Sequence, residues 1–193
     1  MISLSIIIPA YNAAKTLPRT LASLSRIATE DRAAVEVIAI NDGSTDESPS
    51  LLHQAKSDAN SPAFHVLDQT NGGAAKARNA GLAIAQGEWI FFLDADDELN
   101  FNPLTILRTA RDETCFGFTL EYRRGDRVLS RVKPRSITRE GWAEALTAKN
   151  YFQPSSLLFR KRCIEEPFRE GIACVEDWLF WMCIPGIFER MRA

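Results

Sequence analysis

The chain has 193 residues, 46% of them hydrophobic and 25% charged, and 23 basic residues nearly balance 25 acidic ones for a formal charge of -2. This composition excludes disorder, collagen and low-complexity fibres, and the balanced charge predicts no nucleic-acid partner. The four cysteines have no Cys-x-x-Cys spacing and lie far from both histidines, so we expect reduced thiols in a cytoplasmic protein rather than zinc or disulfides.

The first hundred residues alternate short apolar runs with helical patterns. The run 4–8 is β-branched and ends at Pro9, as expected for a strand buried on both faces of a parallel sheet. Ser48 and Pro49 supply an N-cap and a first position for the second helix. Strands are predicted at 4–8, 35–40, 63–67 and 89–93, and helices at 13–27, 51–57 and 74–85. This alternation predicts an α/β fold, with a parallel sheet and helices on both faces.

A second region with a different pattern begins near Asn100. We expect helices at 103–110, 139–149 and 177–184, a hairpin formed by 115–122 and 127–132, and a strand at 155–159. No flexible linker separates the regions, so we expect 1–99 and 100–193 to pack as one compact unit. The chain has no apolar run of about 18 residues and no signal-peptide pattern at its start, so we expect it not to cross a bilayer.

Polar residues follow three of the predicted strands directly. These segments are 9–12, 41–44 and 94–98, with the sequences Pro-Ala-Tyr-Asn, Asn-Asp-Gly-Ser and Asp-Ala-Asp-Asp-Glu. Ligands of open parallel sheets bind beyond the carboxyl ends of the strands. We therefore expect these residues to converge at one edge of the sheet.

The acidic run 94–98 predicts a metal site. Its four carboxylates repel one another unless a cation or a solvated loop relieves the repulsion. Mn²⁺ or Mg²⁺ held by one or two carboxylates keeps coordination positions free for nucleotide phosphates. The alternative is a solvated acidic turn that caps the next helix. The position of the acidic run directly after a buried strand favours the metal site.

Four motifs in order resemble the family 2 glycosyltransferases. They are 6–12, 37–46, 77–82 and 91–97, and the similarity returns at 155–160 and 176–177. The resemblance implies the GT-A fold, with a mostly parallel α/β sheet, helices on both faces and a smaller mixed acceptor-side region. It also implies metal-dependent, inverting transfer of a sugar from a nucleotide diphosphate sugar, expected to be a UDP-sugar, to a glycan or lipid-linked acceptor. Residues 1–99 would form the nucleotide-sugar-binding half and 100–193 the acceptor-side half.

The resemblance also assigns residues to the nucleotide. Those at Pro9, Tyr11 and Asp42 would hold the base, where an aromatic ring can stack and a carboxylate can accept a ring N–H. Arg78 would lie near the nucleotide, and its fixed fork of donors suits a diphosphate. The alternative for Arg78 is a surface arginine on its helix.

Three carboxylates complete the site that the resemblance implies. Asp94 would contact the ribose or the metal shell, and Asp96 would ligate the metal. Asp177, the second member of the pair Glu176-Asp177, would be the general base that takes the proton from the acceptor hydroxyl. The alternative for this pair is an acidic first turn that complements the dipole of the next helix.

Two further patterns have simple structural explanations. The aromatic residues Trp178, Phe180, Trp181 and Phe188 are predicted to bury a helix against the sheet rather than to line a pocket. The pair Gly72-Gly73 is taken as a turn, because neither the dinucleotide fingerprint nor the Walker pattern is present.

The sequence departs from the family at its end, because members commonly continue well past the late acidic pair. We therefore expect a minimal or truncated form, and the alternative function is a nucleotide-sugar-binding module without turnover. A nucleotidyltransferase ranks last, because 9–15 has no glycine-rich loop. Apolar and basic residues at 187–192 also suggest peripheral association with the inner face of a membrane.

Overall fold

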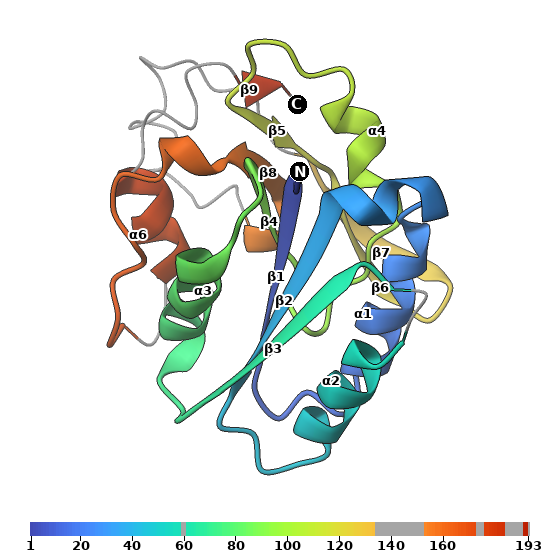
Figure 1. Ribbon diagram of the computed structural model, residues 1–193, viewed down its shortest axis with the longest axis vertical. Coiled ribbons are helices and arrows are strands. Elements are labelled where there is room, and N and C mark those ends of the chain that lie inside the picture. The colour runs from blue at the N-terminus through green and yellow to red at the C-terminus, as the bar shows by residue number, and fades with distance from the viewer. Residues whose placement is uncertain (59–60, 134–152, 173–175, 184–190, 193) are drawn as a thin grey trace.

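A computed structural model describes residues 1–58, 61–133, 153–172, 176–183 and 191–192. Its centre is a seven-stranded sheet with the strand order β3-β2-β1-β4-β8-β5-β9, and helices lie on both sides of this sheet (Figure 1). The predicted fold class, an α/β fold with a mostly parallel sheet and a smaller mixed region, is confirmed.

The first half of the chain supplies the parallel part of the sheet. Its strands are β1 (Leu4–Ala10), β2 (Val35–Asp42), β3 (Ala63–Gln69) and β4 (Trp89–Phe92), and its helices are α1 (Leu17–Ser23), α2 (Ser48–Lys56) and α3 (Gly73–Ile84). Two 3₁₀ segments, Leu24–Arg26 and Thr29–Ala34, lead from α1 to β2. In register, Ile7 of β1 lies between Ile38 of β2 and Phe92 of β4. The carboxyl ends of these neighbouring strands therefore meet at one edge, the lower end of the view in Figure 1.

Alternating side chains of these strands build a core on each face of the sheet. Ile7, Ile38 and Phe92 lie on the face that α3 and α6 (Glu176–Cys183) cover. Ile6, Val37 and Phe91 lie on the face that α1 and α2 cover. Full burial on both faces explains why these strands read as continuous apolar runs in the sequence.

The second half extends the same sheet. It supplies α4 (Pro103–Leu107), β5 (Cys115–Gly117), β8 (Leu157–Arg160), β9 (Met191–Arg192) and two 3₁₀ segments, Pro154–Ser156 and Lys161–Cys163. Strand β8 runs antiparallel to both β4 and β5, so it joins the two halves by backbone hydrogen bonds. The boundary predicted between residues 99 and 100 stays a prediction.

The predicted hairpin strand over 115–122 is two strands in different sheets. Cys115–Gly117 is buried and pairs with β8, whereas β6 (Leu120–Arg124) pairs with β7 (Arg127–Val132) in a separate hairpin. Between them, Phe118 donates its N–H to the carbonyl of Ser156. Apolar residues alternate with other residues without interruption across this break, so the sequence pattern did not reveal the change of sheet.

Two predicted helix starts were also wrong. The helix predicted at 13–27 begins at Leu17, because the preceding residues hydrogen bond to another loop, as described below. The N-cap of α2 is Glu47 rather than Ser48, whose hydroxyl instead accepts a hydrogen bond from the N–H of Ala13. The helix predicted at 139–149 lies outside the described residues.

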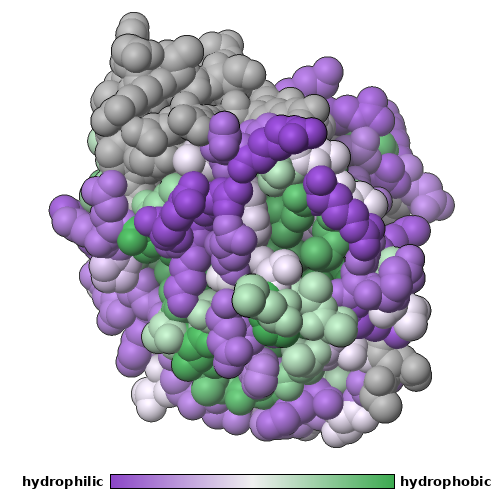
Figure 2. All heavy atoms as spheres, turned by 45° about the horizontal axis from the view of Figure 1, so that its top comes forward, coloured by the Kyte–Doolittle hydropathy of each residue, from purple (hydrophilic) through white to green (hydrophobic). Residues whose placement is uncertain are grey.

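Figure 2 shows the molecule with the upper end of Figure 1 tipped forward. On this face, hydrophobic patches are broken up by hydrophilic residues. Among the helices of the described residues, none is long and apolar enough to span a membrane.

Candidate functional site

The residues after β1, β2 and β4 lie at the same edge of the sheet, because these strands are parallel neighbours. Pro9 pairs in register with Ile40 near the end of β1, and Tyr11 follows with 54% of its surface exposed. Asp42 is the last residue of β2, and Asp94 comes two residues after the end of β4. The predicted convergence at one edge is therefore what the topology produces.

The loop after β1 is tied to the loop after β2. Asn12 takes the left-handed backbone conformation at φ 48°, which asparagine tolerates better than most residues. Hydrogen bonds in this contact run from Asn12 N to Ser44 Oγ (3.0 Å), Ala13 N to Ser48 Oγ (2.8 Å), Ala14 N to Asp46 Oδ2 (3.0 Å) and Thr45 N to Asn12 Oδ1 (2.8 Å). Hydrogen bonds from the Ser48 side chain and the Ala14 N–H lower the pKa of Asp46. This network fixes the backbone on which Tyr11 stands.

Asp42 is buried and binds the start of α3. Its Oδ1 accepts hydrogen bonds from Gln69 Nε2 (2.7 Å) and Gly72 N (2.9 Å), and its Oδ2 accepts one from Gly73 N (2.8 Å). Gly73 needs its glycine, because its φ is +85°. A carboxylate has about four acceptor positions, so these three bonds leave about one for a ligand. The pair predicted as a turn, Gly72-Gly73, is the N-cap and first residue of α3, and a candidate site residue holds it.

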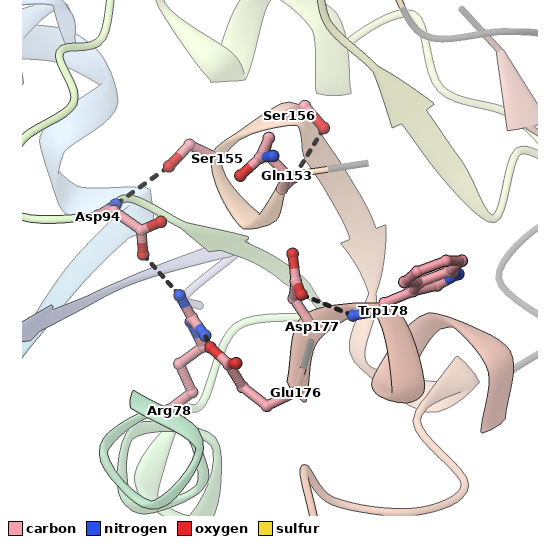
Figure 3. Close-up of polar contacts among 8 residues, drawn as sticks. All are labelled: Arg78, Asp94, Gln153, Ser155, Ser156, Glu176, Asp177 and Trp178. Carbon is pink, nitrogen blue, oxygen red and sulfur yellow. Dashed lines mark hydrogen bonds and ion pairs between the residues drawn. The ribbon is translucent and has the colours of Figure 1, made fainter. Parts of the chain in front are cut away.

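Arg78 is buried at the centre of an ion-pair network between α3, the loop after β4 and α6. Its Nη2 lies 2.9 Å from Asp94 Oδ1 and its Nη1 lies 3.1 Å from Glu176 Oε1 (Figure 3). Burial alone would lower the pKa of Arg78, but Asp94 and Glu176 outweigh it and raise this pKa above its ordinary value. The surface-arginine alternative is therefore wrong, and direct contact with a diphosphate stays a prediction.

The acidic loop after β4 carries negative charge that its surroundings only partly compensate. Burial raises the pKa of Asp97, a hydrogen bond with Ser155 lowers it in part, and the charges of Asp94 and Asp96 raise it further. Ser155 also accepts a hydrogen bond from Asp94 N (3.1 Å), while Asp96 is exposed. Within the described ranges, no three His, Cys, Asp or Glu side chains are grouped to hold a metal. The oxygen donors fit Mg²⁺ or Mn²⁺ bound by one or two carboxylates, with phosphates completing its shell.

Asp177 is the second residue of α6, and its Oδ1 accepts a hydrogen bond from Trp178 N (2.7 Å). The helix is anchored by Phe180, which stacks on Phe168 with 3.8 Å between ring centroids, and by the fully buried Trp181. The core prediction for Phe180 and Trp181 is confirmed, whereas Phe188 lies outside the described residues.

Sequence reasoning missed three residues that support the site. Asn12 and Asp46 join two loops, and Ser155 contacts the acidic loop. Each lies inside or beside a motif that the sequence analysis quoted, but their contacts join positions 32 to 61 residues apart. Glu176 was noted as part of an acidic pair, and only the structure shows its partner Arg78.

Known proteins resemble this chain in sequence or in fold. The uncharacterized glycosyltransferase YibD of Escherichia coli K12 is 45% identical over 96 residues, which is 50% of this chain and 26% of YibD. A solved structure of Staphylococcus aureus TarS 1-349 with UDP-GlcNAc has a TM-score of 0.80 at 23% identity, over 98% of this chain and 55% of that one. The mannosyltransferase PcManGT of Pyrobaculum calidifontis, in complex with GDP-Man and Mn²⁺, has a TM-score of 0.69 at 18% identity, over 98% of this chain and 54% of that one.

The chain therefore spans about a quarter of YibD and just over half of each solved chain. The family model for glycosyl transferase family 2 matches residues 5–172, most of its length. Together with the sheet and its acidic edge, this match shows that the chain belongs to glycosyl transferase family 2.

Proposed function

We propose that this chain is a metal-dependent, inverting glycosyltransferase that transfers a sugar from a nucleotide diphosphate sugar to a glycan or lipid-linked acceptor. The observation that carries the proposal is the ion-pair network in which Arg78 joins Asp94, at the carboxyl edge of the sheet, to Glu176, the neighbour of Asp177. This network brings a donor-side carboxylate and a candidate base to one region. TarS, whose solved structure contains UDP-GlcNAc, supports a UDP-sugar as the donor.

The base would bind between the loops after β1 and β2. The exposed ring of Tyr11 offers a stacking surface beside Pro9, and the loop network holds it in place. The acceptor position left on Asp42 would take the N–H of the base. A pyrimidine base with one ring N–H, such as uracil, fits a carboxylate that has about one free position.

A divalent cation, Mn²⁺ or Mg²⁺, would be held by Asp96 together with the donor phosphates. When bound, it would neutralise charge that accumulates on the leaving diphosphate. Asp96 is exposed and close in sequence to Asp94 and Asp97, whose mutual repulsion such a cation would relieve. The Mn²⁺ in the complex of PcManGT supports this choice of metal.

Asp177 would act as the general base of an inverting transfer. Its carboxylate would take the proton from an acceptor hydroxyl while that oxygen forms a bond to the anomeric carbon, and the bond to the diphosphate would break on the opposite face. TarS, by its name a poly(ribitol-phosphate) β-N-acetylglucosaminyltransferase, supports a polymeric acceptor. We place the reaction in the cytoplasm, because the free thiols of Cys115 and Cys183 fit a reducing compartment.

A thermal-shift screen tests the donor site. UDP, GDP and TDP and their sugars are each added with and without Mn²⁺, and a donor that binds the folded state raises the unfolding temperature. We expect the largest shift with a UDP-sugar and Mn²⁺, and we expect Asp96→Ala to abolish its Mn²⁺ dependence. Glu98→Ala is the control, because Glu98 is an exposed acid of the same loop that lies 3.6 Å from Arg19. No shift with any nucleotide would contradict the proposal.

Donor hydrolysis or transfer to a glycan separates the enzyme from a binding module. We expect Asp177→Asn to keep the thermal shift and to lose transfer. Unchanged turnover in this variant would reject Asp177 as the base. Binding by the wild-type chain without hydrolysis or transfer to any acceptor would favour the module without turnover.

A further inference from the structure

The ion-pair network around Arg78 joins two parts of the chain that are far apart in sequence. Asp94 follows β4 in the first half, and Glu176 begins α6 in the second, 98 residues after Arg78. Only 5% of the Arg78 side chain is exposed, compared with 26% for Asp94 and 17% for Glu176. Figure 3 shows the guanidinium between the two carboxylates, with Asp177 beside Glu176. The network therefore fixes the start of α6 relative to the acidic edge.

The buried charge of Arg78 has both favourable and unfavourable contacts. The guanidinium carbon lies 6.0 Å from the ring centre of Phe92 and 5.5 Å from that of Phe168, in an aromatic setting. Within the described residues, Arg78 Nε is buried with no hydrogen-bond partner, which costs free energy. Replacing buried ion pairs by apolar side chains is often neutral or stabilising, so such networks are weak evidence for stability and serve in some proteins to specify geometry.

The geometry that this network specifies is that of the candidate base. Glu176 is the first residue of α6 and Asp177 is the second, so any shift of Glu176 moves the Asp177 backbone. The buried residues Phe180 and Trp181 also anchor α6, by apolar contacts about a turn further along. Apolar packing is not directional, whereas an ion pair with fixed donors is. We infer that Glu176, held by Arg78, is a positioning residue that aims Asp177 at the donor bound beside Asp94.

This inference rests on the proposed function and gives Arg78 a different task from diphosphate binding. Both terminal nitrogens of Arg78 already hold carboxylates of the chain, and the side chain is almost fully buried. Arg78 thus acts on the donor through Asp94 and on the acceptor through Glu176 and Asp177.

Kinetics of Glu176→Gln and Glu176→Asp in the 193-residue chain test the positioning role. The first variant removes the charge with little change of shape, and the second keeps the charge on a side chain that is one methylene group shorter. We expect each to lower kcat by about tenfold or more, because small misplacements of a reacting group are costly. We expect the Kd of UDP to stay within about twofold, because the donor edge is unchanged.

Glu170→Gln is the matched control. Glu170 also contacts α3, through Asn79 Nδ2 at 3.1 Å, but it is exposed and lies outside the network. Its variant should keep both kcat and the Kd of UDP. If the Glu176 variants have the kcat of Glu170→Gln, or if their Kd worsens as much as kcat falls, the positioning role is refuted.

A double-mutant cycle in urea unfolding tests the bridge without any need for transfer. Asp94→Asn and Glu176→Gln alter carboxylates that share one guanidinium. We therefore expect the change in the unfolding equilibrium constant of the double mutant to differ by about threefold or more from the product of the changes in the two single mutants. Additive effects would refute the bridge. A wild-type chain that shows no transfer would instead refute the enzymatic part of the proposed function, and the unfolding cycle would still decide the bridge.

Discussion

Asp42→Asn changes one atom of the side chain that links β2 to α3, and we expect it to weaken both the fold and nucleotide binding. In the wild type, the Asp42 carboxylate accepts bonds from Gln69, Gly72 and Gly73. The amide of asparagine can keep the two bonds at one oxygen, but its NH₂ group then faces the N–H of Gly73. The start of α3 thus loses one hydrogen bond and a compensating negative charge.

The size of the loss follows from these two changes. An unsatisfied buried donor costs about 1–3 kcal/mol, and a lost anionic contact at a helix N-terminus costs about 0.3–1 kcal/mol. We therefore expect the free energy of unfolding to fall by about 1–4 kcal/mol. At about 2–4 °C per kcal/mol for a chain of this size, the melting temperature should fall by roughly 2–16 °C.

Urea unfolding followed by circular dichroism measures this change, and titration with UDP measures the binding. Asp68→Asn on the neighbouring strand β3 is the control. Asp68 accepts a bond from Asn41 Nδ2 (2.8 Å) and contacts His53 (3.2 Å), but 52% of its side chain is exposed, so the same chemical change should cost less than about 1 kcal/mol. Equal losses in the two variants, or no loss for Asp42→Asn, would refute the view that Asp42 caps α3.

Three further predictions concern packing, thiol reactivity and pH. A Cβ at Gly81 in α3 would lie 2.5 Å from Ile7 Cγ2. Gly81→Ala should therefore lower the free energy of unfolding in urea by up to about 2 kcal/mol, although alanine has the higher helix propensity. A more stable variant would contradict this. Burial, with a smaller contribution from Cys163, raises the pKa of Cys115. In the native protein the partly exposed Cys183 should therefore react with a thiol reagent before the buried Cys115, as followed by mass spectrometry. Early labelling of Cys115 would contradict this. Because the pKa of Asp46 is lowered, its charge stabilises the fold above the ordinary pKa of 3.8, and this stabilisation is lost as the pH falls through the lowered pKa. The melting temperatures of wild type and Asp46→Ala should therefore differ at about pH 6 and converge at acidic pH. A difference that stays constant with pH would argue against a contribution from the charge of Asp46.

The parts of the fold that depend on local apolar patterns could be predicted from the sequence. Runs such as 35–40 are buried on both faces, so their composition alone identifies them as central strands. The turn residues that end them, such as the Asn-Asp-Gly of 41–43, mark the carboxyl edge and hence the candidate site. Gly43 indeed has φ +70°, and a Cβ there would lie 2.7 Å from Asn71 N.

What could not be predicted are contacts between distant segments. Nothing near Ser48 in sequence indicates that its hydroxyl would serve Ala13 rather than cap its own helix, because both uses need the same hydroxyl. Likewise, the strand pattern of 115–122 does not show that Cys115 pairs with Phe159 while Leu120 pairs with Val132. The role of Arg78 depends on Glu176, whose position is set only when α6 packs on the sheet.

The antiparallel strand β8 has a consequence for how the chain can be divided. Because β8 covers the side of β4 away from β1 through the pairs from Trp89↔Arg160 to Phe91↔Leu158, a fragment ending at residue 99 would leave that edge of β4 unpaired. Such a bare strand offers its N–H and C=O groups to any other chain, which promotes aggregation. The candidate nucleotide-binding edge should therefore be produced recombinantly with β8 attached, and a fragment cut after residue 99 should collect in inclusion bodies.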